Sequence, residues 1–137
     1  MSAIREATVD DVLTICNLLR DHDFRTEGVF ESGTKYWVAE AGARLVGAIG
    51  LELGYTSVLL RSAIVDPHLR GKGLGRQLTE CALDWARRGR YVNAYCFSTD
   101  AGSYWVTRGF RPCSVEEVVN ALPAAPQVQL LHRRALK

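Results

Sequence analysis

Apolar residues in the first part of the chain alternate and then recur at helical spacing. Residues 2–6 alternate enough for a short strand, and apolar residues then repeat at helical intervals from Val12 to Leu19. Thr8 stands where an N-cap is expected, and acidic residues in the first turn complement the helix dipole. The pattern predicts a strand followed by an amphipathic helix that ends near residues 21–23.

Three consecutive strands are expected in the middle of the chain. Residues 24–34 show no clear period and predict a loop or a short helix. Residues 35–41 and 44–53 are two β-rich runs on either side of Gly42-Ala43, a pattern that predicts a hairpin. A turn at Gly54-Tyr55 then leads into a third β-rich run at residues 56–66.

Helices and strands alternate in the second half of the chain. A helix is expected from residue 74, because apolar residues there share one helical face, and Gly89 is its expected C′ residue. Residues 91–97 predict a strand, residues 100–108 a short helix and residues 127–136 a last strand. A strand that rejoins the sheet after a helix needs a crossover, so the fourth and fifth strands are expected to be parallel neighbours. The order predicts a mixed α/β fold.

Composition narrows the class of protein. A chain of 137 residues fits a single domain spanning residues 1–137, and 47% apolar with 23% charged residues is ordinary globular usage. The net charge of +2 gives no reason to expect nucleic acid as a partner. The four cysteines lack metal-ligand spacing, and no apolar run approaches the roughly 18 residues of a membrane span. We expect a reduced, cytoplasmic protein without a metal or a membrane partner.

The stretch V-D-P-H-L-R-G-K-G-L-G-R at residues 65–76 carries the chemistry. It lies between an apolar run and a helical pattern, which predicts a strand, a tight turn and a helix. Glycines at 71, 73 and 75 let a ligand approach the backbone, and the free N–H groups at a helix start attract anions. Cations at 70, 72 and 76 surround the same turn, which predicts a site for a polyanion.

The spacing of these glycines excludes two common phosphate loops. A nucleotide P-loop needs G-x-x-x-x-G-K-[ST], but Gly73 follows Lys72; a dinucleotide fingerprint needs a third glycine where Arg76 stands. The remaining pattern, V-x-P-x-x-R-G-x-G-x-G before a helix, resembles the coenzyme A loop of the GNAT N-acetyltransferases. The order of predicted elements also resembles that fold over nearly the whole chain.

This resemblance implies a fold and a co-substrate. The implied GNAT fold has a mixed central sheet of about six to seven strands with helices on both faces. Its fourth and fifth strands are parallel and splay around acetyl-CoA, and GNAT proteins often form homodimers. The residues implied to bind acetyl-CoA are Ala63, Ile64, Val65, Arg70, Gly71, Lys72, Gly73, Leu74, Gly75, Arg76 and Ser98. A backbone N–H near Ala63 would face the thioester carbonyl and stabilise the oxyanion of the tetrahedral intermediate.

Several polar residues are candidates for acceptor chemistry. The amine must attack as a neutral nitrogen, and Glu52, Glu27 or His22 is a candidate to take its proton. For each of them a solvated or structural role is the alternative. Arg61 lies in an apolar strand, where the two-residue period puts it on one face with Ala63 and Val65. An unpaired cation is costly there, so Arg61 needs either a buried acid or an anionic group of the substrate.

The chain departs from the family in the helix after the fifth strand. GNAT enzymes often carry N-x-x-A-x-x-F-Y-x-x-x-G-F, whose Tyr protonates the departing thiolate. Alignment on Gly109-Phe110 puts Ser98 at the Asn position and Trp105 at the Tyr position, with Tyr104 beside it. Tyr104 is therefore the candidate acid, and two alternatives are a thiolate protonated by water and loss of catalysis.

The resemblance implies acetyl transfer from acetyl-CoA to the primary amine of a small molecule, with an amino acid or an analogue carrying an anionic group as a candidate. The alternatives are acetylation of a protein N-terminus or lysine, and a CoA-binding sensor without catalysis. Three short stretches, at residues 59–62, 98–99 and 122–126, also resemble short GNAT proteins linked to arsenic resistance. That group is implied to acetylate amino acids with arsenic or phosphinic side chains.

Overall fold

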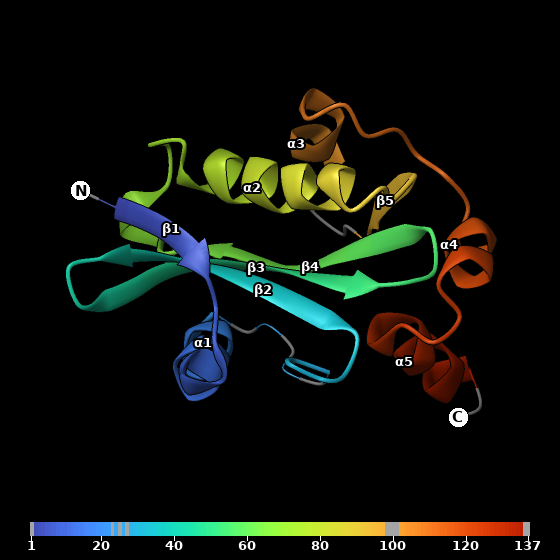
Figure 1. Cartoon of the computed structure of the whole chain (residues 1–137), viewed down its shortest axis with the longest axis horizontal. Coiled ribbons are helices and arrows are strands. Elements are labelled where there is room, and N and C mark those ends of the chain that lie inside the picture. The colour runs from blue at the N-terminus through green and yellow to red at the C-terminus, as the bar shows by residue number, and fades with distance from the viewer. Residues whose placement is uncertain (1, 23, 25, 27, 98–101, 136–137) are drawn as a thin grey trace.

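The computed structural model describes residues 2–22, 24, 26, 28–97 and 102–135. A sheet with strand order β1-β2-β3-β4-β5 lies between two layers of helices (Figure 1). In Figure 1, α2 and α3 lie on one side of the sheet and α1 and α5 on the other. The strands are β1 (Ser2–Glu6), β2 (Thr34–Ala41), β3 (Arg44–Leu53), β4 (Ser57–Val65) and β5 (Asn93–Cys96). The helices are α1 (Val12–Asp21), α2 (Leu74–Arg88), α3 (Gly102–Thr107), α4 (Val115–Ala121) and α5 (Pro126–Ala135), with short 3-10 helices at Val9–Asp11 and Pro67–Leu69.

The predicted order of elements is confirmed as far as α3. β2 and β3 form the hairpin expected at Gly42-Ala43, and β4 and β5 are parallel neighbours. The prediction of a last strand at residues 127–136 is wrong, because residues up to Ala135 form α5. The described part of the sheet therefore has five strands rather than six or seven. Pro126 suits the first turn of a helix, and the apolar residues after it were too few to separate strand from helix by their spacing.

Apolar side chains form separate clusters on the two faces of the sheet. The larger cluster packs α2 and Trp105 against residues of β2, β3 and β4. A second cluster packs Ile15 and Leu19 of α1 against the opposite face, and a third packs α4 and α5 around Leu59. Both faces of the central strands are therefore buried, which explains their nearly continuous apolar sequence.

The C-terminal end of α2 differs from the prediction. Gly89 was expected at C′, but it is the C-cap with a φ of −78°. The left-handed residue is Arg90, with a φ of 66°. Its N–H donates to the Arg87 carbonyl, and the N–H of Tyr91 donates to the Ala86 carbonyl. This pattern is a Schellman motif with arginine at the position that glycine usually occupies.

The N-terminal end of α1 is stabilised as the sequence predicted. Thr8 is the N-cap of the 3-10 helix Val9–Asp11, which continues directly into α1, and its N–H donates to Asp11 over 2.7 Å as part of a capping box. The Arg5 guanidinium also donates two hydrogen bonds to the Asp11 carboxylate, at 2.8 and 2.9 Å. These bonds hold the pKa of Asp11 well below its usual range. One carboxylate thus joins β1 to the start of the first helix.

We expect Asp11→Asn to lower the free energy of unfolding by about 1 kcal/mol at neutral pH, because it weakens this cap. A depressed folded-state pKa contributes stability above the unfolded value of about 4, and the contribution is lost as the pH falls below it. Urea unfolding should therefore show the difference between wild type and variant shrinking as the pH falls from about 5 towards 2. Asp10→Asn, in the same turn, is the control. A difference that stays constant over this range would contradict the prediction.

Candidate functional site

The loop between β4 and α2 presents free backbone N–H groups. Gly71 and Gly73 have φ values of 84° and 80°, and a Cβ built on either would meet no atom within 4 Å. Gly73 is the N-cap of the 15-residue α2, whose first N–H groups have no partner within the helix. Among the described residues, the N–H groups from 71 to 76 donate to no other protein atom. Free N–H groups at a helix start are the kind of site that attracts an anion, so the loop geometry is compatible with the predicted polyanion site.

The three cationic side chains around this loop differ in their contacts and in whether they line the groove. The Arg70 Nε atom reaches back to the Val65 carbonyl over 3.4 Å. Arg76 forms an exposed ion pair with Glu80 at 3.0 Å, one turn further along α2. Both arginines line the groove described next, whereas Lys72 is exposed and does not line it. Arg70 and Arg76 are thus the two loop cations that line the groove.

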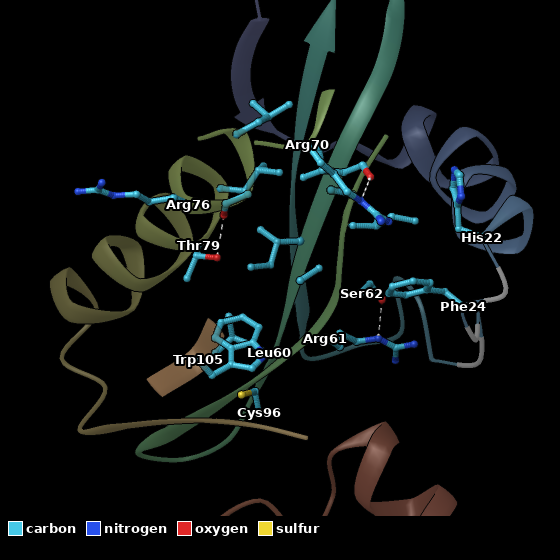
Figure 2. Close-up of a pocket in the computed structure, with 18 of the residues that line it drawn as sticks. His22, Phe24, Leu60, Arg61, Ser62, Arg70, Arg76, Thr79, Cys96 and Trp105 are labelled. Carbon is cyan, nitrogen blue, oxygen red and sulfur yellow. Dashed lines mark hydrogen bonds between the residues drawn. The ribbon is translucent and has the colours of Figure 1, made fainter. Parts of the chain in front are cut away.

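A groove of about 1080 Å³ runs from the loop along β4 as far as Leu60 (Figure 2). It places together most of the residues implied to bind acetyl-CoA. Those that line it are Ala63, Ile64, Val65, Arg70, Gly71, Gly73, Leu74, Gly75 and Arg76. Ser98 lies outside the described residues. The groove continues past Arg61 and Ser62 to His22, Phe24 and Gln127.

The open edge of β4 forms part of this groove. β5 pairs with β4 only from Ser57 to Leu60, where the partner of Leu60 is Cys96. Beyond Leu60, no described strand pairs with this edge of β4. The backbone of residues 63–65 therefore borders the groove without a sheet partner on that side. An extended ligand arm fits such an edge, because unpaired strand groups form hydrogen bonds with it.

A β-bulge interrupts β4 at Ser62. Gly50 of β3 pairs with Arg61 and Ala48 pairs with Ile64, so β4 has an extra residue there. Ser62 takes a left-handed conformation with a φ of 57°. The predicted shared face of Arg61, Ala63 and Val65 is therefore wrong, because a bulge shifts the alternation of side chains.

Arg61 forms a buried ion pair with Glu52. Its Nη1 atom lies 2.8 Å from a Glu52 carboxylate oxygen, and the two residues are 7% and 0% exposed. The other oxygen of Glu52 accepts a hydrogen bond from the Gln127 N–H at 3.0 Å. Burial raises the pKa of Glu52, while Gln127 and Arg61 act in the opposite direction. The buried acid considered for Arg61 is thus Glu52, which does not itself line the groove.

The structure describes only some of the other candidate catalytic residues. His22 lines the groove. Glu27 lies outside the described residues, as does the side chain of Tyr104 in α3. Trp105 lines the groove and packs edge-on against Phe110, with ring centroids 5.3 Å apart. The catalytic roles predicted for Glu52, Glu27 and Tyr104 therefore stay predictions.

Three residues that line the groove near Arg61 were not indicated by the sequence patterns. Phe24 and Gln127 come from segments without a clear period or with a wrong element assignment. Ser62 lies directly after Arg61, and its hydroxyl accepts a hydrogen bond from the Arg61 Nε atom at 3.2 Å. Its position beside a cation in an apolar strand was the available signal.

No helix within the described ranges is long and apolar enough to span a bilayer. Among the same residues, no three His, Cys, Asp or Glu side chains are grouped closely enough to bind a metal ion.

Comparisons with known proteins agree with the geometry. The family model of the acetyltransferase (GNAT) domain matches residues 32–112. A GNAT-family acetyltransferase from Staphylococcus aureus superposes with a TM-score of 0.76 at 17% identity, covering 88% of this chain and 91% of that one. The PaiA N-acetyltransferase of Thermoplasma acidophilum, solved with coenzyme A, gives a TM-score of 0.69 at 15% identity, with coverages of 81% and 90%.

A third structure is N-acetylglutamate synthase from Neisseria gonorrhoeae, solved with coenzyme A and L-arginine. It gives a TM-score of 0.71 at 25% identity and covers 85% of this chain, but the match spans only 28% of the synthase. No curated protein matches the chain in sequence.

Proposed function

The chain belongs to the GNAT family of acetyltransferases, and from this premise we propose that it transfers the acetyl group of acetyl-CoA to the primary amine of a small molecule with an anionic group. The proposal rests mainly on the loop between β4 and α2, because its free N–H groups open onto the groove. A pyrophosphate is the part of acetyl-CoA that such a loop binds. Related structures solved with coenzyme A support the same co-substrate.

The unpaired edge of β4 supports the proposed course of the reaction. The amine nitrogen attacks the thioester carbon, the C–N bond forms, and the C–S bond breaks to release the thiolate. The N–H of Ala63 is proposed to stabilise the charge that develops on the carbonyl oxygen. The amine loses a proton and the thiolate gains one. This chain contributes mainly by holding the two substrates in reacting position.

Proton acceptors in the groove are few. Among the described residues that line the groove, His22 carries the only imidazole and none carries a carboxylate, and burial raises the pKa of the Cys96 thiol to about 11. Glu52 is shielded and doubly hydrogen-bonded, so as a base it would have to act through a water molecule. We keep His22, Glu27 and Glu52 as candidate bases and Tyr104 as the candidate acid.

The proposed contact of the acceptor anion is Arg61. Glu52 holds its Nη1 atom, and its Nη2 atom has no hydrogen-bond partner among the described residues. A guanidinium fixed in this way binds an oxyanion with little loss of side-chain freedom. The finer resemblance to arsenic-resistance proteins is compatible with such an acceptor and stays a prediction, as do the homodimer and the cytoplasmic location.

Two alternative functions fit the groove to different degrees. An acetyltransferase for protein N-termini or lysines would need an open groove without a buried cation, and Arg61 speaks against it. A CoA sensor without catalysis is favoured by Trp105, since the indole has no acidic proton to give to a thiolate.

Acetyl-CoA turnover with a panel of amines tests the proposal. We expect thiol release only when a small amine is present, and mass spectrometry should show one acetyl group added to that amine. The panel should contain amino acids, polyamines, amino sugars and peptides. Acetyl-CoA binding in calorimetry without turnover on any member would favour the sensor, and turnover only on peptides would favour a protein acceptor.

A further inference from the structure

Ser62 has a strained backbone conformation and a side chain that faces the groove. Its φ of 57° lies in the left-handed region, where glycine is favoured and other residues are strained. Outliers of this kind cluster at functional sites, because the strain is kept only where the geometry is useful. Serine retains a hydroxyl at this position, and the residue lines the groove beside Arg61. The hydroxyl is therefore the group of Ser62 that can contact a ligand in the groove.

Hydrogen bonding leaves the Ser62 hydroxyl free to donate. Its oxygen accepts a bond from the Arg61 Nε atom at 3.2 Å, which occupies one lone pair. The Tyr36 hydroxyl, buried behind it, has no hydrogen-bond partner among the described residues. Tyr36 lies close enough to Ser62 and Arg61 for both to affect its pKa, which burial raises to about 12. Because the bond from Arg61 uses only a lone pair of the Ser62 oxygen, the serine proton remains available for donation to a group in the groove.

We propose that Ser62 is a specificity-determining residue that binds the acceptor anion together with the free Nη2 atom of Arg61. The inference rests on the proposed acetyl transfer. Figure 2 shows Arg61, Ser62 and Phe24 on one side of β4, with Trp105 on the other. No Asp or Glu is among the described residues that line the groove, whereas Arg61, Arg70, Arg76 and His22 are. This charge distribution favours an acceptor with an anionic group and disfavours polyamines.

The position of Ser62 also limits the length of the acceptor. Ser62 directly precedes Ala63, the proposed site of the thioester carbonyl, and one residue spans about 3.3 Å of strand. The anion and the attacking nitrogen must therefore lie only a few bonds apart. The substrate class that fits is an α- or β-amino carboxylate or a similarly compact oxyanion. A lysine side chain fits poorly, because its amine lies far from its carboxyl carbon.

A series of amino acids of increasing length tests this class. The number of carbon atoms between the amine and the carboxylate increases from glycine through β-alanine and 4-aminobutyrate to 6-aminohexanoate. Methylamine and ethylamine lack the carboxylate. We expect wild type to give the highest kcat/KM with the short amino acids and lower values along the series. A preference for the simple amines, for spermidine or for 6-aminohexanoate would overturn the inference.

Ser62→Gly removes the hydroxyl while preserving the fold. Glycine suits the left-handed backbone, so the melting temperature of the variant should be at least as high as that of wild type. We expect the ratio of kcat/KM for glycine over methylamine to fall about 10- to 100-fold, mainly through KM, because a bond to a charged group is lost. Arg90→Gly, which removes a left-handed side chain outside the groove, is the matched control and should keep the ratio. An unchanged ratio in Ser62→Gly would overturn the inference.

Calorimetry distinguishes failure of this inference from failure of the proposed function. Acetyl-CoA titrated into the protein alone tests the co-substrate, independently of any acceptor. Glycine titrated into the protein saturated with CoA tests the anion site, even without turnover. Binding of glycine to wild type that weakens in Ser62→Gly supports the site; no binding to wild type overturns it, whatever the acetyl-CoA result.

Discussion

Gly73→Glu is expected to abolish acetyl-CoA binding. Gly73 is the N-cap of α2 and lines the groove, with open space where its Cβ would stand. A glutamate there adds negative charge where the pyrophosphate is proposed to bind. Placing like charges side by side costs several kcal/mol, so we expect the affinity to fall by at least about 100-fold. Isothermal titration calorimetry with acetyl-CoA measures the effect directly.

Gly42→Glu is a matched control for this variant. Gly42 also has a positive φ, of 64°, and open space at its Cβ, but it lies in the β2–β3 turn outside the groove. It should carry a similar backbone strain and leave acetyl-CoA affinity unchanged. Gly73→Ala adds strain without charge and should lose less affinity than Gly73→Glu. Equal affinity of Gly73→Glu and wild type would reject the loop as the pyrophosphate site.

Glu52→Gln is expected to destabilise the whole protein. The change leaves the Arg61 guanidinium buried without its counter-ion, and it also weakens the acceptor for the Gln127 N–H. Removing one partner of a buried ion pair typically costs about 3–5 kcal/mol, because the remaining charge stays desolvated. Chemical denaturation should therefore show a large fall in the free energy of unfolding.

Two further variants make this result specific. Glu80→Gln breaks the exposed pair with Arg76 and should cost less than about 1 kcal/mol. The double variant Glu52→Gln with Arg61→Met removes both buried charges, so it should recover much of the lost stability. If Glu52→Gln unfolded like wild type, the pair would not hold this part of the sheet together. Recovery of stability without recovery of acetylation in the double variant is the expected combination.

Local patterns predicted the loop and most of the secondary structure. The glycines and cations from 70 to 76 lie within one short stretch, so their chemistry was readable from neighbouring residues. The hairpin at Gly42-Ala43 and the N-cap at Thr8 are local in the same way and are confirmed. The parallel pairing of β4 and β5 followed from the helix between them.

The remaining features depend on contacts between distant segments. The bulge at Ser62 is defined by the register of β4 against β3, and the residues of β4 alone continue to alternate. A buried acid for Arg61 was one of two alternatives, and only the hairpin register brings Glu52 to it. Strand and helix were equally compatible with residues 127–136, because that segment is short.

The hydrogen bond from Gln127 to Glu52 has a consequence for how the protein is made. It joins residues 75 positions apart, so it forms only after α5 has left the ribosome. By then the strands, the glycine turn and α2 have all been synthesised. The nascent chain can thus form the sheet, the glycine loop and α2 early, whereas the buried Glu52 carboxylate gains its hydrogen bond from Gln127 only after α5 has been synthesised.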